Sequence, residues 1–404
     1  MINKWLQGLV VIAGTLVTLF LIMHWDVRHG VKNYTKNHPM TETLPGNASI
    51  DIFNTGNSFY NSLFKDIESA DHHIWIHFFI IRDDRVSNDF FDALIDKASS
   101  GVDVRLSVDY LGSDIHNDTI KQLKNGGVKV LKSRPLSFKN LFYSLHHRNH
   151  RRLISIDEDI AYIGGFNMGV EYLGEDPKLG YWRDYHLRLK GSSVKEVYQQ
   201  FKRDWIEDGG GIVKSDQSDF PSTDNREGNV HFIFSTGTPL IERTIEWIDG
   251  ANESVTITTP YFIPNKMLVE ALEKAAKRGV VVNILVPDDT DAWFTKPPSY
   301  RIEKNLLKVG VNLYLYQKGF FHGKVMVIDH KWADVGTANW DPRSLHLNDE
   351  SNCIIRDEGV AMKLESLINK DIKDSEKLTR KAFDELPSWE KALQKTPQWL
   401  YYYF

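Results

Sequence analysis

The chain of 404 residues contains one cysteine, Cys353. A single thiol cannot build a disulfide framework or a cysteine-based zinc site. The fifteen histidines are scattered and show neither the HExxH pattern nor the Cys/His spacings of metal sites, so the sequence implies no metal. Cys353 lies in the apolar segment ESNCIIRD, which is typical of a packed strand.

An excess of positive charge is also missing. Lys and Arg number 49 against 54 Asp and Glu, which gives a net charge of −5. This balance argues against a protein whose main task is to bind nucleic acid, and any basic site must be local. The length and the 42% hydrophobic content allow two domains with full cores.

One long apolar run, residues 5–23, stands out near the N-terminus as WLQGLVVIAGTLVTLFLIM. At a rise of about 1.5 Å per residue, a helix of this length just crosses a hydrocarbon layer of about 30 Å. The alternative is a signal peptide, but the run exceeds an apolar core of about 7–15 residues and no Ala-x-Ala pattern follows. Trp5 and Trp25 bracket the run as interfacial aromatic residues do. We therefore expect a single-pass membrane anchor, while the flanking charges give too thin a bias to decide the side of the membrane that holds the rest of the chain.

After this anchor the chain repeats itself. Residues 48–76 and 229–257 each read as a strand, a Thr-Gly turn, a helix and a second strand, and the two Thr-Gly turns lie 181 positions apart. The segments DALIDKASSGVDVRLSV and EALEKAAKRGVVVNILV then each read as a helix closed by glycine and followed by a buried strand.

This alternation of strands and helices predicts an α/β fold of two pseudo-symmetric domains, each a mostly parallel sheet flanked by helices. A linker rich in Gly, Ser and Asp separates them. The expected boundaries are an anchor at 1–25, a tether at 26–47, a first domain at 48–206, a linker at 207–228, a second domain at 229–386 and an aromatic tail at 387–404.

The stretch LHHRNHRRLISID, residues 145–157, places three histidines and three arginines within seven residues. It has two interpretations: a solvated basic patch that contacts nucleic acid or anionic lipid, or a phosphate site with a titratable histidine and a guanidinium. The repeat favours the site, because two constellations occur at equal spacing. They are His150, Arg152, Asp157 and Asn167 in the first half, and His322, Lys324, Asp329 and Asn339 in the second.

The period of two in a strand says where the basic groups point. His150 and Arg152 are two residues apart, as are His322 and Lys324, so each pair projects from one face of an entering strand. Asn167 and Asn339 follow turns rich in small residues, where the backbone can approach a ligand closely.

These repeats resemble the two HxKxxxxD motifs of the phospholipase D superfamily, the first in the form HxRxxxxD. The resemblance runs from about residue 48 to the C-terminus. The segments RNHRRLISIDEDIAYIGGFNMGVEYLG, YWRDYHLRLKG, FHGKVMVID and GTANWDPRSLHLNDE are similar to those of bacterial cardiolipin synthases in particular. The chain departs from many such proteins in showing one apolar span rather than two, and in carrying Arg152 at the lysine position.

The resemblance implies phosphodiester exchange without metal or nucleotide, in which one histidine attacks phosphorus and the other protonates the departing alcohol. It implies His150 as nucleophile and His322 as acid and base, although the symmetry permits the reverse. Arg152 and Lys324, together with Asn167 and Asn339, would bind the nonbridging phosphate oxygens.

Each histidine also needs a partner for its second ring nitrogen. Asp157 and Asp329 lie roughly 23 Å down their strands, too far for direct contact, so we expect them to anchor neighbouring backbone. Asp184 in YWRDYH and Glu350 in LNDE are better candidates, each at the start of a later strand.

The resulting hypothesis is a synthase in the bacterial cell membrane that forms cardiolipin and glycerol from two molecules of phosphatidylglycerol, with membrane lipids as partners and no nucleic acid. The alternatives are a hydrolase, a phosphatidyltransferase with another alcohol, a nuclease of the same superfamily and a lipid-binding scaffold without catalysis. Oligomeric state and acyl-chain preference stay open.

Two further segments are amphipathic or aromatic. LSFKNLFYSL, residues 136–145, either dips into lipid or packs as an ordinary helix. The end of the chain, PQWLYYYF, either lies at a membrane interface or closes a core.

Overall fold

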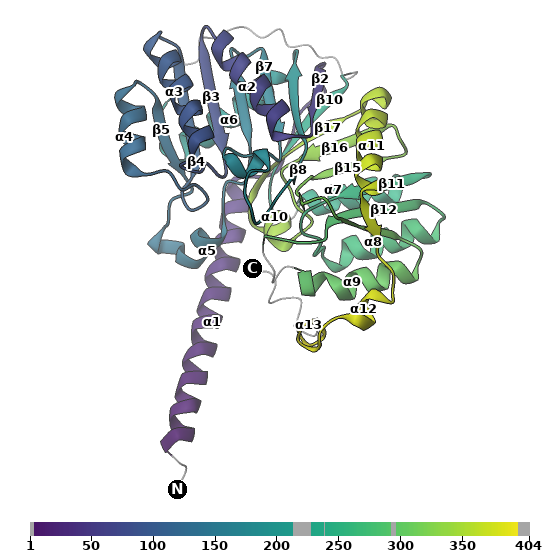
Figure 1. The fold of residues 1–404 in the computed structure, drawn as a ribbon. Helices are drawn as coiled ribbons and strands as arrows, with labels where there is room; N and C mark the ends of the chain where they lie inside the picture. Colours follow the sequence, from purple (N-terminus) through teal and green to yellow (C-terminus); the bar gives the residue numbers. More distant parts are fainter. Residues whose placement is uncertain (1–3, 213–227, 238, 292–295, 395–404) are drawn as a thin grey trace.

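The computed structural model describes residues 4–212, 228–237, 239–291 and 296–394. It shows two α/β domains packed together and one long helix that projects from them (Figure 1). The repeat predicted from the sequence is therefore present as two domains of the same kind. The aromatic end of the chain and most of the linker lie outside the described residues.

The first domain follows the order strand, helix, strand before its motif hairpin. Its elements are β2 (Ser49–Phe53), α2 (Gly56–Ser69), β3 (His73–Phe78), α3 (Arg85–Ser99), β4 (Asp103–Asp109), α4 (Asn117–Asn125), β5 (Lys129–Ser133), η1 (Phe138–Asn140), α5 (Leu141–His146), β6 (Leu153–Ile156), β7 (Ile160–Gly164), η2 (Val170–Leu173), β8 (Trp182–Arg183), β9 (His186–Lys190) and α6 (Val194–Glu207).

The second domain repeats this order with small differences. Its elements are β10 (Val230–Thr236), α7 (Pro239–Gly250), β11 (Ser254–Thr258), α8 (Lys266–Lys277), β12 (Val281–Pro287), α9 (Lys296–Lys308), β13 (Asn312–Tyr316), β14 (Phe320–Phe321), β15 (Val325–Ile328), β16 (Trp332–Gly336), α10 (Pro342–His346), β17 (Asp349–Ile355), α11 (Glu358–Lys373), β18 (Ser375–Lys377), α12 (Ala382–Glu385) and α13 (Ser388–Leu393).

The sheets are mixed, and this corrects the expectation of mostly parallel sheets. Strand order is β2-β9-β7-β6-β3-β4-β5 in the first domain and β1-β10-β17-β16-β15-β11-β12-β13-β18 in the second, where β1 (Thr41–Glu42) comes from the segment before the first domain. Within these two sheets, parallel pairing is confined to β3-β4-β5 and β11-β12-β13. The reason is that each motif strand turns straight back as a hairpin, which forces antiparallel pairing.

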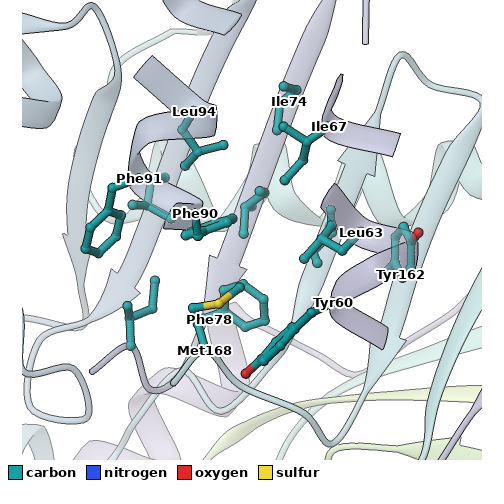
Figure 2. Packing of buried hydrophobic residues seen from close by; sticks show 14 of the residues in the cluster. Tyr60, Leu63, Ile67, Ile74, Phe78, Phe90, Phe91, Leu94, Tyr162 and Met168 are labelled. Atoms are coloured by element: carbon teal, nitrogen blue, oxygen red, sulfur yellow. The ribbon is translucent and has the colours of Figure 1, made fainter. Parts of the chain in front are cut away.

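Each sheet buries its outer face under helices. In the first domain, α2 contributes Phe59 and Leu63, and α3 contributes Phe90 and Leu94, to a cluster that also holds Phe78 of β3. Figure 2 shows Leu63, Phe78, Phe90 and Leu94 among the side chains that meet over the sheet, with Tyr60 and Met168 at one edge. Side chains cap the two helices that cover this face: Thr55 accepts from the backbone N–H of Ser58 at the start of α2, and Asp84 accepts from that of Ser87 at the start of α3.

The inner faces of the two sheets share one apolar layer. Leu153, Ile163 and Leu187 of the first domain belong to the same buried cluster as Val325 and Cys353 of the second. Helices α6 and α11 border this layer at equivalent places in the repeat, since Val197 and Leu364 belong to the cluster as well. The motif strands β6 and β15 therefore lie at the interface, and their entering ends face each other.

The N-terminal helix differs from the expected anchor and tether. Helix α1 runs unbroken from Lys4 to Asn37 and includes a segment of mean hydropathy 2.1, long and apolar enough to cross a membrane. The side chains of Trp5 and of residues 7–19 are exposed, but from Phe20 onward one face packs on the first domain. The segment 26–47 is thus mostly a docked helix rather than a free tether.

Candidate active site

The entering ends of the two motif strands line one cavity of about 450 Å³ between the domains. Its walls include His150, Arg152 and Asn167 from the first domain and His322 and Asn339 from the second. The remaining lining residues are Phe79, Ile80, Arg82, Glu171, Tyr172, Leu179, Trp182, Tyr261, Asp291, Asp341, Arg343 and Asn348. The tertiary structure therefore brings together groups that lie far apart in the sequence.

Backbone hydrogen bonds between the domains fix the positions of both histidines in the same way. The N–H of His322 donates to the carbonyl of Arg183 at 2.7 Å, next to the short parallel pair β8 and β14. The N–H of His150 donates to the carbonyl of Asp349 at 3.0 Å. In each case the acceptor directly precedes a carboxylate, so each histidine is placed beside an acid from the other domain.

Those acids are the two predicted as histidine partners. His150 Nδ1 lies 2.9 Å from both oxygens of Glu350, and His322 Nδ1 lies 2.5 Å from Oδ2 of Asp184. Both carboxylates are fully buried. Because Nδ1 donates to the carboxylate, Nε2 of each ring is left to face the cavity.

The residue behind each carboxylate differs between the halves. A Cβ at Gly165 would lie 2.0 Å from the Asp184 carboxylate, so glycine is needed there for close approach. The equivalent position holds Thr337, whose hydroxyl donates to Glu350 at 2.6 Å. Sequence reasoning missed Thr337, although the pairing of GTAN with IGGFN at equal offset was a usable signal.

Arg152 is the largest fully buried side chain of the described residues. Its Nε donates to Oδ1 of Asn167 at 3.0 Å and one terminal nitrogen donates to the carbonyl of His150 at 2.6 Å. Asn167 thus orients the guanidinium, and its amide group donates in turn to the hydroxyl of Tyr172 at 3.2 Å.

The second half of the site is arranged more loosely. Lys324 is buried and its amine donates to the carbonyl of His322 at 2.5 Å. Oδ1 of Asn339 is buried without a hydrogen-bond partner. An unpaired buried carbonyl at a cavity wall is costly unless a ligand donor completes it.

Burial and neighbouring cations lower the pKa of both histidines and so favour the neutral rings. Burial, with Arg152 and Lys324, holds the pKa of His150 well below its usual value. Burial, with Lys324, lowers the pKa of His322 to about 4 even though Asp184 opposes the shift. Burial also lowers the pKa of Lys324 to about 7.

The two carboxylates are shifted in opposite directions. Burial raises the pKa of Glu350 to about 7, against the hydrogen bond from Thr337. Burial also opposes ionisation of Asp184, but Lys324 and His322 outweigh it and hold the pKa of this carboxyl below its usual range. His322 therefore faces a full negative charge, whereas the partner of His150 is half-neutral near pH 7.

The motif aspartates lie away from the cavity. Asp157 accepts from the backbone N–H groups of Asp71, His72 and His73 at 2.7–2.8 Å, and Asp329 accepts from those of Asn252, Glu253 and Ser254. Each also opens the hairpin turn with a positive φ, 51° for Asp157 and 52° for Asp329. They hold the motif hairpin to the neighbouring strand, so a place among the catalytic groups does not fit them.

The two other arginines of the segment 145–157 form ion pairs inside the protein. Arg148 pairs with Asp109 and Arg151 pairs with Asp204, and all four side chains are nearly fully buried. The solvated basic patch considered from the sequence is thus absent from this segment. Across residues 4–212, 228–237, 239–291 and 296–394, the structure forms no cluster of three His, Cys, Asp or Glu suited to a metal ion.

Several cavity residues lie outside the motifs that the sequence shows. Tyr261 donates to Asp291 at 2.5 Å, and Asp341 and Arg343 come from α10 and the residue that caps it. Their positions follow from loops that meet at the cavity, which spacing in the sequence does not encode.

The family model described as "Cardiolipin synthase, PLD-like domain" matches residues 63–205 and 244–372, one match in each domain. The cardiolipin synthase of Oceanobacillus iheyensis is 37% identical over 372 residues, which cover 90% of this chain and 76% of that protein. The major cardiolipin synthase of Bacillus subtilis is 37% identical over 349 residues, which cover 84% of this chain and 72% of that protein.

Two solved structures share the fold. Phosphatidylserine synthase of Haemophilus influenzae superposes with a TM-score of 0.70 at 14% identity and covers 90% of this chain and 96% of its own. Polyphosphate kinase of Porphyromonas gingivalis gives a TM-score of 0.54 at 13% identity and covers 80% and 50%. At these identities the two structures support the fold of this chain and nothing more about it. The family model and the relatives of high coverage together show that the chain belongs to the cardiolipin synthase family of phospholipase D-like proteins.

Proposed function

We propose that the protein is a cardiolipin synthase that transfers a phosphatidyl group from one phosphatidylglycerol to another and releases glycerol. The observation that carries the proposal is the pair of histidine–carboxylate contacts at one cavity, His150 with Glu350 and His322 with Asp184. Relatives of 37% identity bear the same name. The apolar helix α1 would hold the enzyme in the bacterial cell membrane as a single-pass anchor.

In the first half of the reaction, Nε2 of His150 attacks phosphorus and a P–N bond forms. The bond from phosphorus to the glycerol oxygen breaks, and that oxygen takes a proton from Nε2 of His322. The low pKa of His150, caused by burial and by Arg152, keeps the Nε2 lone pair free for attack.

His322 suits the role of acid because its partner stays ionised. An imidazolium is stabilised by the Asp184 charge 2.5 Å away, and the bound phosphodiester adds a further negative charge that raises the pKa of His322 from about 4. Glu350 stabilises charge on His150 less well because burial raises its own pKa to about 7. This difference supports His150 as nucleophile and His322 as acid.

The second half reverses the path. A hydroxyl of the second phosphatidylglycerol attacks phosphorus, its proton passes to Nε2 of His322, and the P–N bond to His150 breaks. Cardiolipin leaves and both histidines return to their starting protonation. Arg152 and Lys324 offset the negative charge of the phosphorane, with Asn167 holding the guanidinium in place.

The rival activities differ only in what attacks the intermediate, or in the substrate. Water in place of the second lipid would give a hydrolase. A nuclease loses its support, because the arginines beside His150 are buried in ion pairs rather than lined up for a phosphate backbone.

The test is to incubate the purified protein in mixed micelles with phosphatidylglycerol alone, and in parallel with single-stranded DNA. Cardiolipin and glycerol in equal amounts are expected. Phosphatidic acid as the main product would instead assign a hydrolase, and nicked DNA would assign a nuclease. The His150→Ala variant, which lacks the attacking nitrogen, serves as the control for contaminating activity.

A further inference from the structure

The segment of residues 136–145, η1 and α5 with the approach to them, exposes apolar side chains to solvent. The exposed fraction is 96% for Phe138, 38% for Leu136 and Leu145, and 36% for Leu141. Leu141 and Leu145 are four residues apart on α5 and share one face of that helix. Phe138 lies on the preceding turn η1, and Lys139 is exposed beside it. A face of this kind on a protein surface marks an interaction site.

The opposite face of the segment packs on α1, where the apolar run of that helix ends. Phe142 and Tyr143 share a cluster with Phe20, Met23 and Val27 of α1. Phe20 and Met23 are the last turn of the apolar run 5–23, and Val27 lies roughly 10 Å farther along the helix axis than Phe20.

This contact is specific and close. The N–H of Tyr143 donates to Oδ2 of Asp26 at 3.0 Å. A Cβ at Gly30 would lie 2.2 Å from the Tyr143 ring, so the ring rests directly on the backbone of α1. Segment 136–145 is therefore held at a fixed position along the axis of α1.

A bilayer that holds residues 5–19 of α1 must then reach this segment. The headgroup zone on each side of the hydrocarbon is roughly 5–8 Å thick. A segment in contact with both Phe20 and Val27 spans that zone, and its apolar face points away from the protein. Figure 1 shows α5 beside α1 at the point where α1 leaves the domains.

The same segment leads into the cavity. The carbonyl of His146, the last residue of α5, accepts from Arg343 at 3.2 Å, and Arg343 lines the cavity wall. Leu347, one residue before the lining residue Asn348, packs in the cluster formed by α1 and Tyr143.

We propose that residues 136–145 form a second membrane contact, in which Phe138, Leu141 and Leu145 enter the lipid headgroup zone and seat the cavity mouth against the bilayer. The proposal rests on the membrane location given to α1 under the proposed function. A bilayer is the occupant that fits, because the segment packs on α1 at the end of the apolar run and leaves its other apolar side chains exposed. The gain is that a lipid with two acyl chains reaches His150 without leaving the bilayer.

The first test reads membrane depth and needs no turnover. A nitroxide is attached to the Phe138→Cys variant of the full chain in phosphatidylglycerol nanodiscs, and collision rates with oxygen and with a nickel chelate are measured. The native Cys353 is fully buried, and unmodified protein gives the background. The matched control is Met362→Cys on α11, where the native side chain is 54% exposed on the second domain.

The label at position 138 is expected to be shielded from the nickel chelate and open to oxygen, whereas the label at position 362 is expected to be open to both. Equal accessibility to the nickel chelate at the two positions overturns the proposal. An inactive enzyme with a shielded label at 138 would instead count against the proposed function and leave this inference standing.

The second test separates surface binding from chemistry. The double variant Phe138→Ser, Leu141→Ser is expected to lose about tenfold in rate on phosphatidylglycerol vesicles, because two apolar contacts with lipid are removed. Its rate on dispersed short-chain phosphatidylglycerol should equal that of the parent protein, and Met362→Ser should change neither. Equal losses on both substrates, or none on vesicles, contradict the proposal.

Discussion

Nδ1 of His150 lies 2.9 Å from both carboxylate oxygens of Glu350, although the two residues stand 200 positions apart and in different domains. The mirror contact joins His322 to Asp184. Each domain thus supplies a histidine and the acid that orients the other domain's histidine. Neither domain holds a complete half of the site alone, so the two must fold together to act.

The amide variants Glu350→Gln and Asp184→Asn should each lower kcat by on the order of 10²–10⁴-fold, because an amide no longer holds Nδ1–H and the wrong tautomer becomes available. Steady-state kinetics on phosphatidylglycerol measures the effect. Asp334→Asn is the matched control: this carboxylate is also buried but accepts from Asn352 and does not line the cavity. If the control loses as much as the two site variants, the contacts serve folding rather than chemistry.

A covalent intermediate should form on His150. In the His322→Ala variant, no base takes the proton of the second lipid's hydroxyl, so the P–N bond breaks more slowly and phosphatidyl label should accumulate on the protein. The label should be stable in base and labile in acid, and absent from His150→Ala. Label retained by His150→Ala would exchange the roles of the two histidines.

The pH profile of kcat/KM should be a bell with both limbs near pH 7. Glu350 must be ionised, and this form is lost as pH falls through its raised pKa of about 7; Lys324 must be charged, and this form is lost as pH rises through its lowered pKa of about 7. The apparent values belong to the coupled cluster. Bound phosphodiester raises the pKa of Lys324, so the alkaline limb of kcat should lie at higher pH. A flat profile between pH 6 and 8 would contradict this picture.

The arginine in the first motif should matter through its charge. Arg152 is fully buried, and a guanidinium keeps its proton there where an amine does not. Arg152→Lys should retain activity near pH 6 and lose it more steeply than the parent above pH 7, whereas Lys324→Arg should flatten the alkaline limb. Arg152→Ala should lose on the order of 10²–10³-fold in kcat at every pH. Parent-like activity of Arg152→Ala would exclude the two-motif mechanism.

The motif aspartates should affect stability and spare the chemistry. Asp157→Asn and Asp329→Asn each weaken three charge-assisted backbone hydrogen bonds, which should cost about 1–3 kcal/mol in the free energy of unfolding. Those bonds lower the pKa of both carboxyls, so the stabilisation is present above the unfolded-state pKa and fades as pH falls through the folded-state value. Urea unfolding at pH 7 and pH 3 measures it. A loss of kcat by more than 10² in folded protein would show a direct role.

The effect of shortening α1 on folding and activity should depend on where the shortened chain begins. A chain that begins at residue 20 keeps the docked face of α1 and should fold. A chain that begins at residue 45 removes Tyr34, whose hydroxyl accepts from Arg134 at 2.7 Å, and Arg134 in turn donates to Asp349, the neighbour of Glu350. The shorter chain should therefore lose both thermal stability and kcat on dispersed substrate. Equal activity of the two chains would restore the simple tether first expected from the sequence.

The sequence determined the features that depend on local pattern. The equal spacing of His150 and Arg152 with His322 and Lys324 predicted two copies of one site, because a strand has a period of two and repeats keep their offsets. The apolar run predicted a helix that suits a membrane. Asp184 and Glu350 were within reach of the same reasoning, because each lies close to the start of a strand after its motif: Asp184 precedes β9 and Glu350 is the second residue of β17.

The tertiary structure decided what depends on contacts between distant segments. Each histidine pairs with the acid of the other domain because of backbone hydrogen bonds to the carbonyls of Arg183 and Asp349. Spacing along the chain does not predict these contacts. The mixed sheets follow from hairpins whose direction is set by three-residue turns that begin at Asp157 and Asp329, a geometry with positive φ that composition did not reveal. The docking of α1 depends on the ring of Tyr143, which packs directly on the backbone of Gly30. Close packing requires two complementary surfaces, and the sequence does not show which segments will face each other.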